Sequence, residues 1–186
     1  MIIRGFQESD REDIRRICSD GAMGSYAKNP KKRKAISIVY VDYYMDREPQ
    51  NVLVAEEEGS IAGYIVCSTD GEKYQKEFPE YIKRSKKYAF LFSQFQKICL
   101  KTNKKLDQIY SGGFHISVDK NRQSKGIGKQ LLNAMAEHLK QNGCKHMYLI
   151  TKNRHTKGYG FYMHYGFKEV KRYPFGSLLL VYDIMK

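Results

Sequence analysis

Apolar and polar positions in the first third of the chain predict a strand, a helix and a β-hairpin. Residues 1–4 are mainly apolar and predict a short opening strand, whereas Ser9 and Glu12 have the spacing of a capping box that begins a helix. Apolar side chains then recur at helical spacing. Two apolar runs, 52–55 and 61–67, flank an acidic turn that contains a glycine, which indicates a hairpin.

The middle of the chain has a less regular pattern. Residues 21–30 are typical of a loop, and 35–45 are rich in tyrosine and fit a helix or a strand, with the connectivity favouring a helix. Residues 73–105 are rich in lysine and interrupted by Pro79, and the apolar side chains of 88–102 recur at the spacing of one amphipathic helix. We therefore expect 73–105 to be a helical insertion between the third and fourth strands, with its lysines facing solvent.

The last third of the chain alternates between strand and helix patterns. The segments follow one another at 109–118, 128–141, 147–151, 156–165, 167–173 and 178–184. The resulting order, β-α-α-β-β-insertion-β-α-β-α-β-β, predicts an α/β fold with a mixed central sheet flanked by helices. The length of 186 residues is that of one domain, so we expect a single domain over residues 1–186.

Composition excludes several classes of protein. With 41% hydrophobic residues the chain can form a core, which excludes a disordered protein. Neither a long apolar run nor an apolar N-terminal segment is present, so no membrane-spanning segment and no signal peptide are expected. The cysteines are scattered and form no C-x-x-C pair, which suggests reduced thiols and a cytoplasmic protein; they are Cys18, Cys67, Cys99 and Cys144.

The formal net charge of +13 is unevenly distributed along the chain. Residues 28–34 hold five basic side chains and no acidic one, and 73–105 hold ten basic side chains against two acidic ones. Residues 42–58 are, in contrast, mainly acidic. Basic clusters of this kind are typical of a nucleic-acid-binding module or of a solvated basic surface.

Residues 123–129, Gln-Ser-Lys-Gly-Ile-Gly-Lys, join a predicted strand to a predicted helix. Glycines at such a junction let the backbone approach a ligand closely, and the free amides of the helix N-terminus favour an anion. A Walker A loop requires Ser or Thr where this chain has Gln130, and a dinucleotide fingerprint requires a third glycine that is absent here. The pattern Gln/Arg-x-x-Gly-x-Gly/Ala, following a strand that ends in Val118, is matched at every position.

This loop resembles the acyl-CoA-binding motif of the GCN5-related N-acetyltransferase (GNAT) superfamily. A second segment agrees: Asn153, followed by 161–167, Phe-Tyr-Met-His-Tyr-Gly-Phe, is similar to the family's Asn-x(n)-Leu/Phe-Tyr-x-x-x-Gly-Phe pattern. The two motifs occur in order at the usual separation, and the resemblance covers most of the chain except 73–105. It implies a GNAT-type mixed central sheet flanked by helices.

The resemblance also implies an acetyl-CoA site. The pantetheine arm is expected to pair with the strand before the loop, at Ile116, Ser117 and Val118, and Asn153 matches a position that contacts this arm. The negatively charged phosphates are expected at the loop and the first turn of the following helix, at Gln123, Ser124, Lys125, Gly126, Ile127, Gly128 and Lys129.

Acyl transfer to an amine requires a proton acceptor, donors for the oxyanion and a proton donor for the leaving thiolate. Tyr162 matches the family's tyrosine acid by its position in the motif. His115, on the strand before the loop, is the candidate base because an imidazole titrates near neutrality. Strand alternation places it on the face opposite Ile116 and Val118, so water relays through the second helix or through Glu56 are alternatives.

These observations predict an N-acetyltransferase that transfers an acetyl group from acetyl-CoA directly to a primary amine of a small molecule or a protein. The alternatives are a GNAT-like domain that binds acyl-CoA without catalysis and a basic nucleic-acid or ribosome-associated module. A metal, a membrane and a nucleic acid are not expected partners, and a homodimer is left open. Residues 21–44 and 73–105 are expected to shape the acceptor pocket, whose charge the sequence leaves open; a polyamine, an aminoglycoside, an amino acid and a protein amine are the candidate acceptors.

Overall fold

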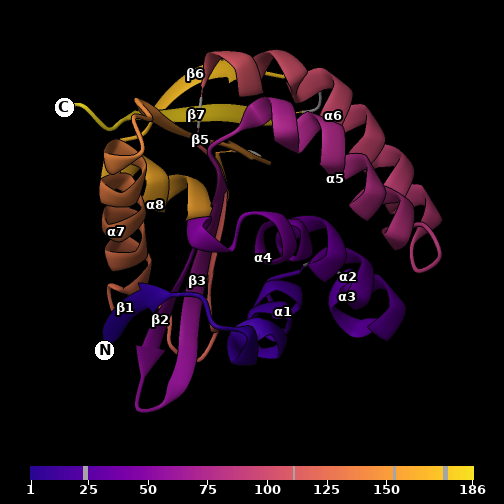
Figure 1. Ribbon diagram of the computed structural model, residues 1–186, viewed down its shortest axis with the longest axis horizontal. Helices are drawn as coiled ribbons and strands as arrows, with labels where there is room; N and C mark the ends of the chain where they lie inside the picture. Colours follow the sequence, from indigo (N-terminus) through magenta and orange to yellow (C-terminus); the bar gives the residue numbers. More distant parts are fainter. Residues whose placement is uncertain (23–24, 111, 153, 174–175) are drawn as a thin grey trace.

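The computed structural model describes residues 1–22, 25–110, 112–152, 154–173 and 176–186. Its centre is a seven-stranded sheet with the strand order β1-β2-β3-β4-β5-β7-β6 (Figure 1). Neighbouring strands are antiparallel except β4 and β5, which are parallel. The strands are β1 (Ile2–Gly5), β2 (Val52–Glu57), β3 (Ser60–Ser68), β4 (Gly113–Val118), β5 (His146–Thr151), β6 (Lys168–Arg172) and β7 (Leu178–Asp183).

Helices cover both faces of the sheet (Figure 1). α7 and α8 lie on one face, and the helical elements between β1 and β4 lie on the other. Each face of the sheet has its own hydrophobic core, and consecutive residues of β3 contribute to different cores. Tyr64 packs with α1 on one face, and Ile65 packs with α7 on the other. The helical elements are η1 (Glu8–Asp10), α1 (Arg11–Asp20), α2 (Ser25–Lys28), α3 (Pro30–Ser37), the π-helix η2 (Ile38–Asp42), α4 (Tyr43–Arg47), η3 (Pro49–Asn51), α5 (Gly71–Ser85), α6 (Phe90–Ile109), α7 (Ile127–Gln141) and α8 (Lys157–Tyr165).

The first helix begins differently from the prediction. The carboxylate of Asp10 accepts a hydrogen bond from the backbone amide of Gln7 at 2.8 Å, and the guanidinium of Arg4 donates to the same carboxylate at 2.7 Å. The predicted capping box of Ser9 and Glu12 is therefore wrong. Asp10 caps the turn instead because Arg4, on the neighbouring strand, holds its carboxylate in place, which the local pattern does not reveal.

The segment after α1 is more helical than predicted. Residues 21–30 are expected to form a loop, but they contain the short helix α2, and α3 begins at Pro30. The side chain of Asn29 accepts a hydrogen bond from the backbone amide of Lys32 at 3.1 Å and so caps α3. The chain then continues through η2 into α4, which confirms the helical assignment of 35–45.

Most other predicted elements are present with small shifts at their ends. β2 and β3 form the expected hairpin, and its turn residues Glu58 and Gly59 have φ angles of +52° and +71°. The strand predicted over 109–118 is shorter than expected, because α6 continues into this range and β4 begins at Gly113. The predicted turn at 174–177 lies partly outside the described residues.

The lysine-rich segment between β3 and β4 forms two helices, α5 and α6, which arch together over one face of the sheet (Figure 1). The apolar stripe predicted for the second helix is only partly buried. Phe92 packs on Tyr26 with ring centroids 5.7 Å apart, whereas Leu91 is 79% exposed and Phe95 is 59% exposed. Gln96 is buried instead. The prediction of a single apolar stripe facing the core is therefore wrong for α6. Its inner face borders a cavity whose lining also includes polar side chains such as Gln96.

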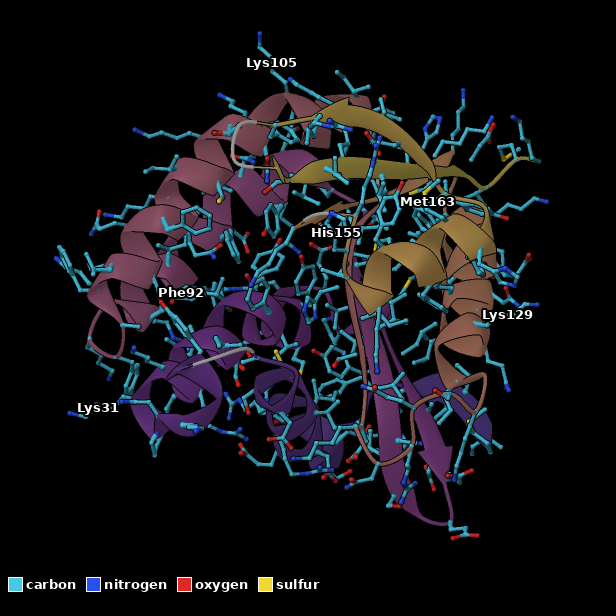
Figure 2. The ribbon with its side chains drawn as sticks, turned by 180° about the vertical axis from the view of Figure 1, so that it is seen from behind. Lys31, Phe92, Lys105, Lys129, His155 and Met163 are labelled. Carbon is cyan, nitrogen blue, oxygen red and sulfur yellow. The ribbon has the colours of Figure 1, made fainter. Side chains whose placement is uncertain are left out.

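The basic clusters lie on the outside of these helices. Figure 2 shows Lys31 of α3 and Lys105 of α6 pointing away from the protein. None of the helices in the described parts of the chain combines the length and the apolar character needed to cross a bilayer. The described residues also contain no group of three or more His, Cys, Asp or Glu side chains placed to hold a metal ion.

Candidate active site

β4 and β5 begin as neighbours and then separate. Within the described residues they pair at Gly113 and Tyr148, whereas β4 pairs with β3 from Gly113 to Val118. The edge of β4 that faces β5 is thus left without a strand partner from Ile116 onward. A cavity of about 500 Å³ opens at this gap, lined by Ile116 on β4 and by Leu149 on β5.

Side chains from both faces of the sheet line the cavity. Phe114 of β4 packs among the residues of α7 and α8, while His115, the next residue, stacks on Tyr40 on the opposite face. Both residues line the cavity, and so does Tyr162 of α8. Groups from the two faces therefore meet in one space.

The glycine loop stands at the start of α7. Gly126 has a φ angle of +80° and directly precedes Ile127, the buried first residue of the helix. Ser124 also has a positive φ angle, +66°, and the side chain of Gln123 donates to the carbonyl of Val118 at 3.4 Å. The first amides of α7 have no partner within the helix, so this turn can bind an anion.

The remaining residues expected to contact the coenzyme differ in their placement. Gly128 lies against the ring of Phe161, which a Cβ at this position would approach to 3.1 Å, so a larger side chain would separate α7 from α8. Ser117 faces α1, where its hydroxyl lies 3.2 Å from the position of a Cβ on Gly21. The backbone of Ser117 can contact a ligand at the strand edge, but its side chain lies on the face of the sheet that α1 covers, opposite to Ile116 and Val118. Asn153 lies outside the described residues.

The positive charges near the loop are not equivalent. Lys125 and Lys129 are exposed, and Figure 2 shows Lys129 on the outer side of α7. Arg122 is instead held by β2 and β3: its guanidinium donates to the hydroxyl of Ser60 at 2.6 Å and lies 3.4 Å from the carboxylate of Glu57. The two lysines are therefore better placed than Arg122 to meet an anionic ligand.

Tyr162 is the α8 tyrosine that lines the cavity. Its ring centroid lies 6.1 Å from that of Phe114 and 5.4 Å from that of Phe167. Burial raises the pKa of the Tyr162 phenol well above its ordinary value, so the hydroxyl keeps its proton at neutral pH. Tyr165, one turn later, donates instead to the side chain of Asn133 at 2.8 Å and packs outside the cavity.

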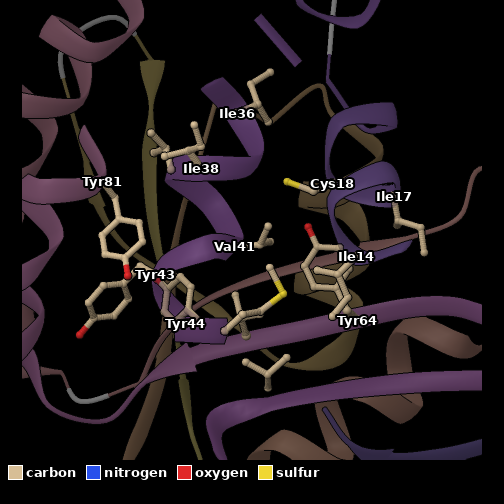
Figure 3. Packing of buried hydrophobic residues seen from close by; sticks show 14 of the residues in the cluster. Ile14, Ile17, Cys18, Ile36, Ile38, Val41, Tyr43, Tyr44, Tyr64 and Tyr81 are labelled. Atoms are coloured by element: carbon tan, nitrogen blue, oxygen red, sulfur yellow. The ribbon is translucent and has the colours of Figure 1, made fainter. Parts of the chain in front are cut away.

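His115 approaches the cavity from the opposite face. Its ring stacks on Tyr40 with centroids 4.9 Å apart and an interplanar angle of 21°, and its Nδ1 lies 3.0 Å from the hydroxyl of Tyr64. Figure 3 shows this tyrosine in the core with its hydroxyl directed toward Cys18. Burial lowers the pKa of His115 to about 4, so the imidazole is neutral at pH 7.

The alternation predicted for β4 is thus confirmed, but the sequence did not identify the partners of His115. Tyr40 lies in the tyrosine-rich segment, which signals an aromatic cluster without saying what it contacts, and nothing in the local pattern marks Tyr64. A water relay through Glu56 is not supported, because this carboxylate accepts from Arg4 at 2.6 Å and does not line the cavity.

Together these features can accommodate an extended ligand with an anionic head. An unpaired strand edge suits a chain that hydrogen bonds as an added strand, and the helix start beside it suits the anion. A protonated phenol and a neutral imidazole then reach the far end of that ligand from opposite faces. This arrangement provides a proton donor and a proton acceptor on the lining of one cavity.

Comparison with known proteins agrees with the fold and the loop. The family model described as "Acetyltransferase (GNAT) family" matches residues 25–167. No curated protein matches the sequence. The crystal structure of SsHAT superimposes with a TM-score of 0.76 at 18% sequence identity, covering 100% of this chain and 98% of that chain.

Two further solved structures show the same fold. A ribosomal-protein-alanine N-acetyltransferase from Brucella melitensis has a TM-score of 0.62 at 15% identity, and a polyamine N-acetyltransferase from Drosophila melanogaster has a TM-score of 0.64 at 12% identity. Each comparison covers 98% of this chain and 99% of the other. At these identities the structures establish the fold, and the family match extends over most of the sequence. The chain belongs to the acetyltransferase (GNAT) family.

Proposed function

We propose that this protein transfers an acetyl group from acetyl-CoA directly to a primary amine. The observation that carries the proposal is the cavity at the gap between β4 and β5, which is lined by Tyr162 and His115 from opposite faces of the sheet. The free edge of β4 beside this cavity runs toward the glycine loop at the start of α7. Family membership supports acyl transfer, and the geometry supports the assignment of roles to residues.

Acetyl-CoA supplies an acetyl group activated as a thioester. We assign its pantetheine arm to the free edge of β4 at Ile116 and Val118, and its pyrophosphate to the amides of residues 123–128. Lys125 and Lys129 are exposed beside this turn and add favourable charge, each contributing up to about 1 kcal/mol. Contact between the pantetheine arm and the side chain of Asn153 stays a prediction from the family motif.

Tyr162 is assigned as the acid. The raised pKa of its phenol keeps the proton on the oxygen at neutral pH, and that proton is available to the thiolate that leaves the acetyl group. Its position on the cavity wall, with its ring fixed between aromatic neighbours, limits the side-chain freedom that would otherwise have to be lost on reaction.

His115 is assigned as the proton acceptor. With a pKa of about 4 it is too weak a base to deprotonate a free ammonium ion in solution, so the amine must enter in its neutral form. After the amine has attacked the thioester its nitrogen becomes positively charged and far more acidic, and a neutral imidazole can then take the proton. Transfer of the amine from water into a partly apolar cavity favours its neutral form.

Calorimetric titration with acetyl-CoA tests the first half of this proposal. We expect saturable binding at micromolar concentrations, and an absence of binding below millimolar acetyl-CoA would overturn the proposal. Release of free thiol on addition of amines tests the second half. Tight binding of acetyl-CoA with no amine-dependent thiol release would instead identify an acyl-CoA-binding domain without catalysis.

A further inference from the structure

The side of the cavity away from α8 is aromatic. Tyr40 of η2, Tyr44 of α4, and Tyr74 and Phe78 of α5 line it, and we call these side chains, together with the α6 residues facing them, the helical wall. The rings of Tyr74 and Phe78 stack with centroids 4.5 Å apart at 19°, and Tyr44 stacks on Tyr74 at 6.1 Å and 29°. These stacked rings hold one another in place and give this side of the cavity an aromatic lining, which suits a planar, apolar ligand.

The polar groups of the helical wall are uncharged. α6 contributes the side-chain amides of Gln96 and Asn103. Among the described residues that line the cavity there is no Asp or Glu, and Lys152 of the β5 side is the one Lys or Arg. The basic clusters of α3, α5 and α6 therefore point outward and do not give the cavity their charge.

A carboxylate does lie close behind the wall, but it is fully engaged. Glu48 is 2% exposed and does not line the cavity, whereas its partner Ser68 does. One oxygen of Glu48 accepts from the hydroxyls of Ser68 and Tyr43, both at 2.8 Å. The other accepts from the side-chain amide of Asn51 at 2.9 Å and the backbone amide of Thr69 at 3.1 Å. This carboxylate holds β3 and η3 together and is not available to a ligand cation.

The lining discriminates between classes of amine. An acceptor with a second ammonium group would bury that charge without a carboxylate partner, which is unfavourable. An acceptor with an aromatic ring would instead bury apolar surface of its own ring and of the aromatic lining, which is favourable. The same desolvation favours the neutral amine that the weakly basic His115 requires.

We propose that the acceptor is an arylalkylamine, a primary amine joined by a short chain to a flat aromatic ring that lies against Tyr40, Tyr44, Tyr74 and Phe78. This inference rests on the proposed acetyl transfer. In the reaction the amine nitrogen bonds to the carbonyl carbon of the thioester and the carbon–sulfur bond breaks. The nitrogen loses one proton and the thiolate gains one, giving an N-acetyl amide and free CoA thiol.

A panel of amines tests the proposal with the wild-type chain. Phenethylamine, hexylamine and diaminobutane are compared by thiol release, after acetyl-CoA binding has been established by calorimetry. We expect kcat/KM for phenethylamine to exceed that for diaminobutane by at least about tenfold, with hexylamine between them. A preference for diaminobutane, or equal rates for all three amines, would overturn the assignment of the acceptor class.

A charge substitution in the helical wall provides the converse test. Asn103→Asp changes the side chain little in size but places a carboxylate on the lining, and should raise the ratio of diaminobutane to phenethylamine kcat/KM about threefold to fivefold. Asn103→Ser is the matched neutral control and should leave the ratio near its wild-type value. Unaltered affinity for acetyl-CoA shows that each variant is folded.

The outcomes separate this inference from the proposed function. Failure to bind acetyl-CoA removes the proposed function, whereas binding followed by transfer to diamines removes the acceptor class alone. If acetyl-CoA binds and no amine in the panel reacts, phenethylamine is titrated into the CoA-loaded protein. An absence of binding at millimolar phenethylamine then also rejects the arylalkylamine assignment.

Discussion

The two walls of the cavity are built in different ways. The sheet wall, formed by β4, β5 and α8, presents the unpaired backbone edge of β4, which runs toward the glycine loop and the amides at the start of α7. The helical wall presents side chains, chiefly aromatic rings from η2, α4 and α5. Backbone groups at fixed spacing suit a ligand common to a whole family, whereas side chains gathered from several helices suit a ligand particular to one chain.

This difference separates the chemistry from the choice of acceptor. Tyr162 belongs to the sheet wall and is found by its place in a motif, while Tyr40 and its neighbours have no motif. His115 connects the two, because it lies on β4 but faces the helices and stacks on Tyr40. Substitutions in the sheet wall should therefore change the rate for every amine, and substitutions in the helical wall should change the preference among amines.

The largest effect is expected from Tyr162→Phe. Removing the proton donor should lower kcat by about a hundredfold or more with every amine, since general acid catalysis contributes about 10²–10⁴-fold. The affinity for acetyl-CoA should change little because the ring is retained. Steady-state kinetics and calorimetry measure the two quantities. Tyr165→Phe, which removes a hydroxyl outside the cavity, is the control, and an equal loss in both variants would contradict the assignment of Tyr162 as the acid.

The next effect concerns pH and His115. The pKa of this group is about 4 in the folded protein and 6.5 for an unperturbed imidazole, so between these values the unfolded chain binds a proton that the folded chain does not. The free energy of unfolding should therefore fall as the pH drops, by roughly 2 kcal/mol from this group between pH 7 and pH 4.5. Carboxylates also titrate in this range. The quantity to compare is therefore the change in the free energy of unfolding between the two pH values, measured by denaturant unfolding for wild type and for His115→Gln.

The same pKa makes a prediction for the rate. If His115 is the proton acceptor, the acidic limb of the kcat/KM profile should contain a step near pH 4, and His115→Gln should remove that step. A profile that is unchanged in the variant would assign the base role to another group or to water.

A smaller effect is expected from Gly126→Ala. This residue has a φ angle of +80°, and a Cβ there should lower the free energy of unfolding by about 1–2 kcal/mol and weaken acetyl-CoA binding by distorting the turn. Gly160→Ala is the matched control: this glycine lies within α8 with open space around its Cβ position, so the exchange should stabilise the protein by about 0.5–1 kcal/mol. Equal effects in the two variants would show that the turn needs no glycine.

The smallest effect is expected from Tyr64→Phe. Loss of the hydroxyl beside His115 should cost about 1 kcal/mol of stability and should shift the acidic limb of the pH–rate profile. Tyr43→Phe removes a buried hydroxyl that donates to Glu48 instead and should lower stability without altering the profile. A pH–rate profile that is identical in both variants would show that Tyr64 does not position His115.

Local patterns predicted those elements whose cause is local. The β2–β3 hairpin, α7 and α8 follow from apolar spacing and from glycines with positive φ angles at their ends, and the glycine loop follows from its position between β4 and α7. The predictions failed where a distant residue decides the outcome. Asp10 rather than Ser9 caps the first turn because Arg4, in the preceding strand β1, donates to its carboxylate, a tertiary contact that the helical pattern does not include. α6 exposes Leu91 because its inner side faces a cavity.

The net charge shows the same division. The sequence located the basic residues in 28–34 and 73–105, the segments expected to shape the acceptor site, but left the sign of the pocket open. The tertiary structure places only the second of these segments on the cavity, where the lining includes side chains of α5 and α6, while no described residue of 28–34 lines it. Lys31 and Lys105, one from each segment, point outward (Figure 2).

The sequence by itself therefore determined the family, the order of most strands and helices, and the glycine loop before α7, because these depend on spacing along a short stretch of chain. Only the tertiary structure decided which side chains share the cavity with Tyr162: His115 stacked on Tyr40, and an aromatic helical wall without a carboxylate among its described residues. It also decided that the buried hydroxyl of Tyr64 contacts His115. These contacts join residues far apart in the chain, and their energies depend on burial and on neighbours that no local pattern specifies.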